Sequence, residues 1–188
     1  MPRIPGVPNR DANLLTRLTY RFSKRRYGAV LDPLAVVAHH QGLLMASGVS
    51  ELALEKAAKA LPANLRELAV YRTATRIGCS WCVDFGTMLQ RNEGLDIDRL
   101  KEIDHYRTSD KYSEVERLVI AYADAMTEQP MQVTDEQVAE LDERLGHKGL
   151  VELTYMIAVE NQRSRTNHAL GLTAQGFTSG EACRVPMP

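Results

Sequence analysis

Residues 65–86 read LRELAVYRTATRIGCSWCVDFG, and the fold and function of this chain turn on the pattern they contain. Apolar residues recur at steps of three and four up to Gly78, which is typical of a helix with a broad buried face. Cys79 and Cys82 follow at once, where we expect the next helix to begin. Unpaired amide groups and the helix dipole favour a thiolate at such a position. The stretch therefore predicts two helices joined at Gly78, with a cysteine pair at the junction.

The cysteine pair allows interpretations that differ in chemistry. Cys79 and Cys82 are three residues apart on one helical turn, close enough for a disulfide, although cysteine is also a frequent core residue. A zinc site would need two more soft ligands, but there is no second CxxC, and the five histidines show no paired ligand spacing. We interpret the pair as a redox dithiol, with an inert core pair as the alternative, and expect neither metal nor cofactor.

Composition restricts the class of protein. The chain has 188 residues, of which 44% are hydrophobic, as expected for one globular domain. Its 23 basic and 24 acidic residues nearly cancel, so it lacks the field of a protein that binds nucleic acid or an anionic membrane. Neither an apolar run of membrane-spanning length nor a signal-peptide pattern occurs. We expect a cytoplasmic protein, in a reducing compartment that disfavours a purely structural disulfide.

Helical periodicity dominates the rest of the chain, and strand-like alternation is nearly absent. Capping signals occur at Asp32 and Ser50, and as capping-box spacings from Ser113 to Glu116 and from Thr134 to Gln137. We predict an all-α, single-domain helical bundle over residues 13–188, preceded by a flexible, proline-rich N-terminal arm over residues 1–12. The expected helices cover residues 32–48, 50–61, 62–78, 79–94, 113–130, 134–146 and 148–172.

Glu67 stands within the apolar helix that precedes the pair. A buried carboxylate with a raised pKa is a candidate proton carrier, whereas an ion pair with Arg or Lys of another helix would make it structural. Tyr71 is four residues later, on the same face. Asp84 is turned away from Cys82 on a helix, so we expect it to be solvated.

Several further side chains are candidates for the site or for the core. His168 lies on a largely apolar line with Leu150, Ile157 and Leu172, either as a catalytic group or as a core histidine bonded to a carbonyl. One of His39 and His40 is expected to face inward. Trp81 either walls the site or belongs to a subunit interface. Cys183 is expected to be a free surface cysteine.

The spacing Glu67, Cys79, Cys82, set in residues 65–86, resembles the AhpD-like (alkylhydroperoxidase) branch of the carboxymuconolactone decarboxylase family. The later stretch NQRSRTNHALGLTAQGF is similar to the C-terminal part of many members. The resemblance implies an AhpD-like helical subunit that assembles as a homo-oligomer, a trimer or hexamer. It also implies a dithiol that reduces a small hydroperoxide with electrons from a thiol or dithiol donor. Cys82 would attack, Cys79 would resolve, and Glu67 would begin a proton relay.

The cysteine segment departs from the family pattern in two places. A histidine often stands between the cysteines, where this chain has Ser80 and Trp81. Members carry a histidine four residues after the second cysteine, and this chain has Gly86 there. The relay from Glu67 would then run through Tyr71 or His168.

We expect a thiol peroxidase or disulfide reductase in antioxidant defence. Two alternatives remain open. One is a decarboxylase-like lyase acting on a small lactone acid, although the decarboxylases of the family lack the cysteine pair. The other is a non-enzymatic redox-sensing oligomer whose disulfide alters its assembly, which the missing relay histidine keeps open.

Overall fold

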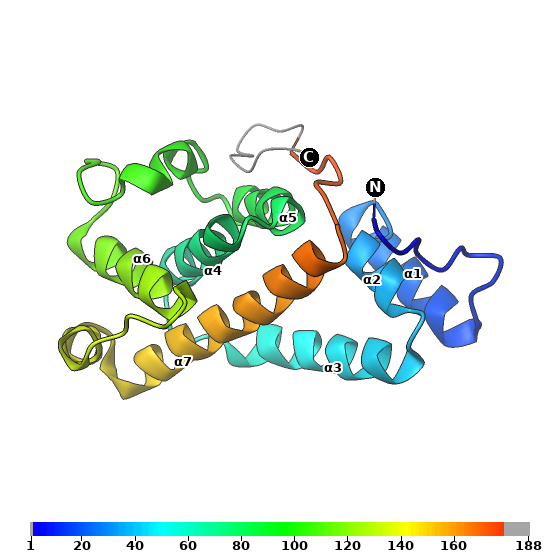
Figure 1. The fold of residues 1–188 in the computed structure, drawn as a ribbon, viewed down its shortest axis with the longest axis horizontal. Coiled ribbons are helices and arrows are strands. Elements are labelled where there is room, and N and C mark those ends of the chain that lie inside the picture. The colour runs from blue at the N-terminus through cyan, green and yellow to red at the C-terminus, as the bar shows by residue number, and fades with distance from the viewer. Residues whose placement is uncertain (1, 179–188) are drawn as a thin grey trace. The chain divides into compact units, whose positions relative to one another are not determined.

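The computed structural model describes residues 2–178, and within them every regular element is helical (Figure 1). The fold class is therefore all-α, as the sequence predicted. The elements are α1 (Leu14–Tyr27), α2 (Asp32–Val37), α3 (Gln41–Ala57), α4 (Ala63–Ile77), α5 (Ser80–Asn92), the 3₁₀ helix η1 (Asp98–His105), α6 (Glu114–Thr127) and α7 (Asp135–Ala169).

The described residues form two compact units. Unit 1 comprises the chain up to Ala58 together with Leu170–Leu172, and unit 2 comprises Lys59–Ala169 and the chain from Thr173 on. We predicted no boundary near residue 58 from the sequence, and the single domain over residues 13–188 stays a prediction.

Unit 1 contains α1, α2 and α3 around a small core of Ala12, Tyr20, Ala38 and Leu44. Its N-terminal segment has no helix, but hydrogen bonds hold it. The Arg3 N–H donates to the Leu170 carbonyl at 2.8 Å, and the Val7 N–H donates to the Ala35 carbonyl at 2.9 Å. The Tyr20 hydroxyl donates to the Val7 carbonyl at 2.7 Å. Most of the arm that we expected to be flexible is therefore anchored to unit 1.

The boundary between α2 and α3 corrects a sequence prediction. We expected the break at Gly48 and Ser50, but α3 runs through both of them. The break lies at residues 38–40, where the His40 Nδ1 accepts a hydrogen bond from the Leu43 N–H and caps α3. A single glycine inside a helix is tolerated at a modest cost, so it was a weak stop signal. His39 and His40 are both exposed, and neither faces inward as expected.

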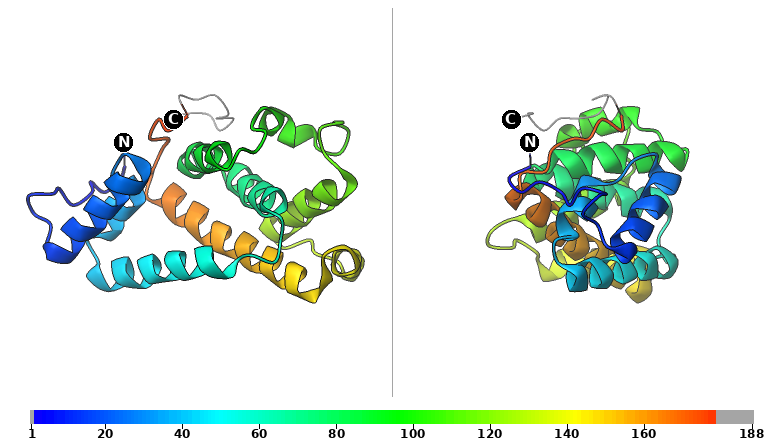
Figure 2. Two further views of the ribbon diagram at one scale, coloured as in Figure 1. Left: turned by 180° about the vertical axis from the view of Figure 1, so that it is seen from behind. Right: turned by 90° about the vertical axis from the view of Figure 1, so that its right-hand side faces the viewer.

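Unit 2 is built around α4, which packs against α5, α6 and α7 (Figures 1 and 2). Most of the apolar residues that predicted a broad buried face on this helix are buried, among them Leu65, Leu68, Ala69, Tyr71 and Ala74. The broad buried face of α4 is therefore accounted for within the chain itself. The core that it shares with α6 and α7 consists of Leu61, Leu65, Ala69, Val119, Tyr122, Ala123, Leu141, Leu153 and Ile157.

A buried ion-pair network fixes α4 to η1 and α6. The Arg72 guanidinium donates to Asp124 at 2.5 Å and to Asp104 at 2.7 Å, and the Tyr106 hydroxyl donates to Asp124 at 3.2 Å. Burial and the Asp124 charge raise the pKa of Tyr106 to about 12. Arg72 and Asp124 are the least exposed charged members of the network, and breaking a buried ion pair by removing one partner typically costs about 3–5 kcal/mol.

Two predicted capping boxes are present. The Ser113 Oγ accepts from the Glu116 N–H while Glu116 accepts from the Ser113 N–H, at the start of α6. The same reciprocal bonds join Thr134 and Gln137 before α7. Gly146, at φ 69°, breaks α7 where the sequence predicted the end of one helix and the start of another.

Replacing Gly86 by alanine should stabilise the protein. Gly86 is inside α5, and a Cβ built there would be 4.0 Å from the Tyr71 Cδ2, an ordinary contact. Alanine exceeds glycine in a helix interior by about 0.5–1 kcal/mol, and urea unfolding of Gly86→Ala should show a gain of that order. Gly78→Ala is the control: at φ 83° a side chain is strained, so this variant should lose stability. A loss in Gly86→Ala would mean that Tyr71 packs more closely on α5.

Candidate functional site

The site begins at the junction of α4 and α5, which is only two residues long. Gly78, at φ 83°, ends α4 by donating its N–H to the Thr75 carbonyl at 3.2 Å, and Cys79 donates its N–H to the Ala74 carbonyl at 3.0 Å. These two hydrogen bonds form a Schellman motif, which favours glycine at the left-handed position. Cys79 is at the same time the N-cap of α5, because its Sγ accepts from the Cys82 N–H at 3.2 Å.

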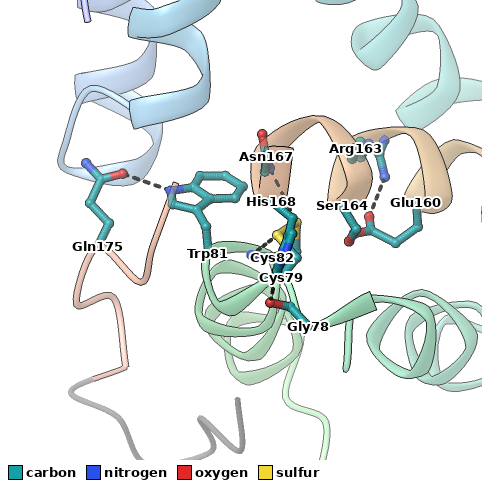
Figure 3. The surroundings of a disulfide bond; sticks show 10 residues. All are labelled: Gly78, Cys79, Trp81, Cys82, Glu160, Arg163, Ser164, Asn167, His168 and Gln175. Atoms are coloured by element: carbon teal, nitrogen blue, oxygen red, sulfur yellow. Dashed lines mark hydrogen bonds and ion pairs between the residues drawn. A yellow bond between two sulfur atoms is a disulfide. The ribbon is translucent and has the colours of Figure 1, made fainter. Parts of the chain in front are cut away.

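Cys79 and Cys82 form a disulfide across the first turn of α5, with their Cα atoms 5.3 Å apart (Figure 3). Both are largely buried, but Cys79 is only 1% exposed and Cys82 is 8% exposed. The predicted pair is therefore in the position expected from the sequence. Cys82 is thus the more exposed residue of the pair.

A polar stripe on α7 faces the cysteine pair. The Asn167 Nδ2 donates to the Cys82 Sγ at 3.3 Å, and the Ser164 Oγ donates to Glu160 at 2.6 Å. Glu160, Ser164 and Asn167 are at most 5% exposed and follow at steps of four and three, so they share one face of the helix. In Figure 3, Ser164 and Glu160 lie on the opposite side of the pair from Trp81.

We did not predict this stripe from the sequence. His168 lies on the neighbouring line of α7, whereas Glu160, Ser164 and Asn167 continue a different line, that of buried Leu153. The signal was present, because polar residues that continue a buried apolar line point to a buried polar site.

His168 is exposed and turns toward the end of α4. Its Nδ1 lies 3.2 Å from the Gly78 carbonyl, with the ring N–H as the donor (Figure 3). It lines an open pocket of about 460 Å³ with Arg76 and Arg165, where α4, α6 and α7 all end. Basic side chains are favoured beside helix C-termini, which accounts for all three. His168 thus contacts a backbone carbonyl, but it is exposed and does not lie in the core.

Glu67 is mostly buried on α4 and pairs with Arg66, whose Nε is 3.1 Å from its carboxylate. Burial raises the pKa of Glu67, although the charges of Arg66 and Arg163 act against it. One ion-pair partner of Glu67 is thus its own neighbour in sequence, and the charge of Arg163 acts on it from α7. Tyr71 is 1% exposed, and its ring lies against Gly86. Within residues 2–178, no hydrogen bond joins Glu67 to either sulfur.

Asp84 is buried, which corrects the prediction that it would be solvated. Its carboxylate accepts the N–H groups of residues 175–178 at 2.8–3.0 Å and the Thr178 hydroxyl at 2.7 Å. Burial opposes the charged form, but the bonds from Thr178, Phe177 and Gly176 outweigh it and lower the pKa of Asp84. Two residues after Cys82, Asp84 lies on the opposite face of α5, and a segment some 90 residues later in the sequence covers this face.

Trp81 belongs to an aromatic cluster that closes one side of the pair. It stacks on Phe85 with ring centroids 4.8 Å apart and meets Phe177 edge-on at 6.5 Å. Its Nε1–H donates to the Gln175 Oε1 at 3.1 Å (Figure 3). Of the two interpretations of Trp81, these contacts favour a wall of the site. Cys183 lies outside the described residues.

The described part of the chain offers neither a cluster of metal-ligating side chains nor a membrane-spanning helix. It contains no group of three or more His, Cys, Asp or Glu side chains placed to hold a metal ion. None of its helices combines the length and the apolarity that crossing a membrane requires.

Replacing Glu67 by glutamine should alter the pH dependence of stability. Because burial raises the pKa of Glu67, the unfolded chain loses this proton at a lower pH than the folded one. Ionised Glu67 therefore reduces stability as pH rises from about 4 through its folded pKa. In urea unfolding, Glu67→Gln should gain on the wild type between acidic and neutral pH. Glu143→Gln, at an exposed position on α7, is the control. A difference that does not vary with pH would show that the ion pair with Arg66 offsets burial completely.

Known structures share this fold. The apo debrominase Bmp8 superposes with a TM-score of 0.82 over 97% of both chains, at 18% sequence identity. A cysteine-to-alanine variant of Bmp8 in complex with 2,3,4-tribromopyrrole gives a TM-score of 0.80 over 93% of this chain and 92% of that one, at 19% identity. A protein of unknown function from Agrobacterium tumefaciens, for which the role of antioxidant defence protein AhpD has been suggested, gives 0.61 at 23% identity, over 68% of this chain and 90% of that one.

Sequence comparison agrees with the fold. The uncharacterized protein YnjA of Escherichia coli (strain K12) is 29% identical over 186 residues, which cover 99% of this chain and 97% of YnjA. The model of the carboxymuconolactone decarboxylase family matches residues 38–125. The matched residues include the cysteine pair, and the resemblance noted in the sequence is confirmed over them.

Proposed function

We propose that the protein is a dithiol oxidoreductase that reduces small hydroperoxides or disulfides through Cys79 and Cys82. The observation that carries the proposal is the disulfide at the N-terminus of α5, where Cys79 is both a redox partner and the helix cap. Helix N-termini stabilise thiolates, and a pair on one turn opens and closes with little movement of the backbone. We propose that the protein works in a reducing compartment such as the cytoplasm, with a thiol donor.

The proposed cycle has three steps. The Cys82 thiolate attacks the terminal oxygen of a hydroperoxide, and the O–O bond breaks. A sulfenic acid forms on Cys82, and the alkoxide that leaves takes up a proton and becomes the alcohol. Cys79 then attacks the Cys82 sulfur and water leaves, which gives the disulfide. Two thiols of a donor reduce the disulfide and become oxidised themselves. The greater exposure of Cys82 supports its role as the attacking sulfur, and burial of Cys79 supports its role as the resolving one.

The proton for the leaving alcohol would come from a group near the pair. Glu67 is the proposed source, because a carboxyl with a raised pKa carries a proton closer to neutral pH. Tyr71, packed against Gly86, and His168, bonded to the Gly78 carbonyl, are the candidates for the rest of the relay.

Reductive dehalogenation is a second candidate, because the fold agrees with a debrominase over nearly the whole chain. The aromatic cluster of Trp81, Phe85 and Phe177 beside the pair would suit a flat apolar substrate. The chemistry balances with the same two electrons. The dithiol becomes a disulfide, and the carbon–bromine bond is replaced by carbon–hydrogen with release of bromide and a proton.

Turnover should separate these functions. We expect the reduced protein with a dithiol donor to consume cumene hydroperoxide, and mass spectrometry of the oxidised protein to show the loss of two hydrogens in the peptide with Cys79 and Cys82. Cys82→Ser should abolish turnover. Cys79→Ser should stop at a trapped sulfenic acid after one equivalent of peroxide. Cys183→Ser, outside the pair, is the matched control and should keep full turnover.

Each other outcome identifies a different function. Consumption of 2,3,4-tribromopyrrole without consumption of hydroperoxide would replace the peroxidase proposal by dehalogenation. Disulfide formation without turnover of either compound, but with a change of assembly, would identify the redox-sensing oligomer. Loss of carbon dioxide from a lactone acid in Cys82→Ser would identify the lyase.

We also propose that the protein is a homo-oligomer. The buried face of α4 no longer supports this, because it is covered within the chain. Support comes instead from large apolar side chains of unit 1 that are at least 45% exposed and spaced as helical stripes. They are Leu14, Leu18 and Phe22 on α1 and Met45, Val49 and Leu52 on α3.

Light scattering at micromolar concentration should therefore give a mass well above the 21.0 kDa of one chain, with a trimer or hexamer implied by the family. Phe22→Glu should lower that mass, since it would place a charge on the stripe of α1. Arg21→Glu, an exposed residue of the same helix, tests whether any added negative charge has this effect. A monomer in the wild type would contradict the proposal.

A further inference from the structure

Asn167 is a buried amide whose side chain meets a sulfur atom. It lies at the C-terminal end of α7, is 5% exposed, and donates from Nδ2 to the Cys82 Sγ at 3.3 Å (Figure 3). Neither the family pattern nor the proton relay from Glu67 gives this residue a role.

The chemistry of the acceptor makes this contact informative. A buried amide N–H without a good acceptor is costly, and the sulfur of a disulfide or thiol is a weak acceptor. A thiolate is a charged acceptor, and hydrogen bonds to charged groups are the stronger ones. The Asn167 amide is therefore matched to the reduced, ionised state of Cys82 better than to the disulfide.

The two sulfurs differ in the kind of donor that they face. Cys79 Sγ accepts the Cys82 backbone N–H, which any residue at position 82 would supply. Cys82 Sγ accepts from a side chain of another helix. The negative charge of the reduced pair can thus be directed to one sulfur by the choice of a single residue on α7.

The rest of the stripe holds Asn167 in place. One helical turn earlier, Ser164 is fully buried and donates to Glu160, which also accepts from Arg163 at 3.4 Å. These bonds fix the buried side chains within α7. The packing of α7 against α5, with this face buried, limits the rotation of the helix. The amide therefore meets Cys82 from a fixed direction.

We propose that Asn167 stabilises the thiolate of Cys82 and so makes Cys82, rather than Cys79, the attacking sulfur. The inference rests on the proposed dithiol function but concerns the ionisation of Cys82, which can be measured without any substrate. The proton leaves Cys82 for water, and the Asn167 N–H keeps its own proton throughout.

The test uses the full-length chain with Cys79→Ser and Cys183→Ser, so that Cys82 is the one remaining thiol. Serine is a good N-cap and should preserve the start of α5. The midpoint of thiolate formation is read from ultraviolet absorbance against pH, which needs no access to the sulfur, and from the pH dependence of alkylation by iodoacetamide.

Three variants are compared with Asn167 in that background. Asn167→Ala removes the donor and should move the midpoint up by about one pH unit, a tenfold change in the thiol–thiolate equilibrium. Asn167→Asp has nearly the same shape but replaces the donor by a negative charge, so it should move the midpoint further. Asn161→Ala, which removes an α7 amide bonded to Thr127 and Ile157, should leave it unchanged. Circular dichroism checks that each variant folds.

The inference is supported if the midpoint of thiolate formation is lowest with Asn167, higher in Asn167→Ala and highest in Asn167→Asp. Loss of packing alone would not place alanine below aspartate. Equal midpoints with asparagine, alanine and aspartate at position 167 would overturn the inference, and so would a lower midpoint in Asn167→Asp. If the order holds while the wild type reduces neither hydroperoxide nor disulfide, the inference stands and the proposed function fails.

Discussion

The site depends on one constraint, which is that α4 ends and α5 begins within two residues. Gly78 can take the left-handed conformation that ends α4, and Cys79 immediately caps α5 with its own sulfur. No loop intervenes, so the direction of α5 is fixed by the end of α4, and α4 is itself held by the buried Arg72 network. The cysteine pair is thus placed by the end of α4, and its sulfurs accept the Cys82 N–H and the Asn167 side-chain amide.

Local signals were sufficient for this part of the molecule. Gly78, the CxxC spacing and the two capping boxes each act over a few residues, and the sequence predicted all of them correctly. The prediction was wrong at Gly48 and Ser50, where weak stop and start signals fell inside α3. A helix propensity of about 1 kcal/mol at one glycine is easily outweighed by packing and by a cap elsewhere, here the His40 ring.

The remainder of the site was not predictable from local pattern, because distant segments form it. Asp84 is buried only because residues 175–178 direct four backbone N–H groups at it. Asn167 reaches Cys82 only because α7 packs against α5 with a particular rotation. A rotation by one residue would bring His168 to the sulfur instead, which is one of the two arrangements that the periodicity of α7 left open. Periodicity identifies faces of a helix, but the contact between two helices selects among them.

These contacts also explain how a dithiol site can tolerate Gly86. A histidine four residues after Cys82 would do two things, since it would withdraw a proton from the thiol and return one to the leaving group. The first task can be met without a base, because an amide donor and a helix N-terminus stabilise the thiolate once water has taken the proton. The second task cannot be met by a donor that keeps its proton. We propose Glu67 for this second task, because burial raises the pKa of its carboxyl in the required direction. In this proposal, stabilising the nucleophile and protonating the product belong to different helices, α7 and α4, with the cysteine pair of α5 between them.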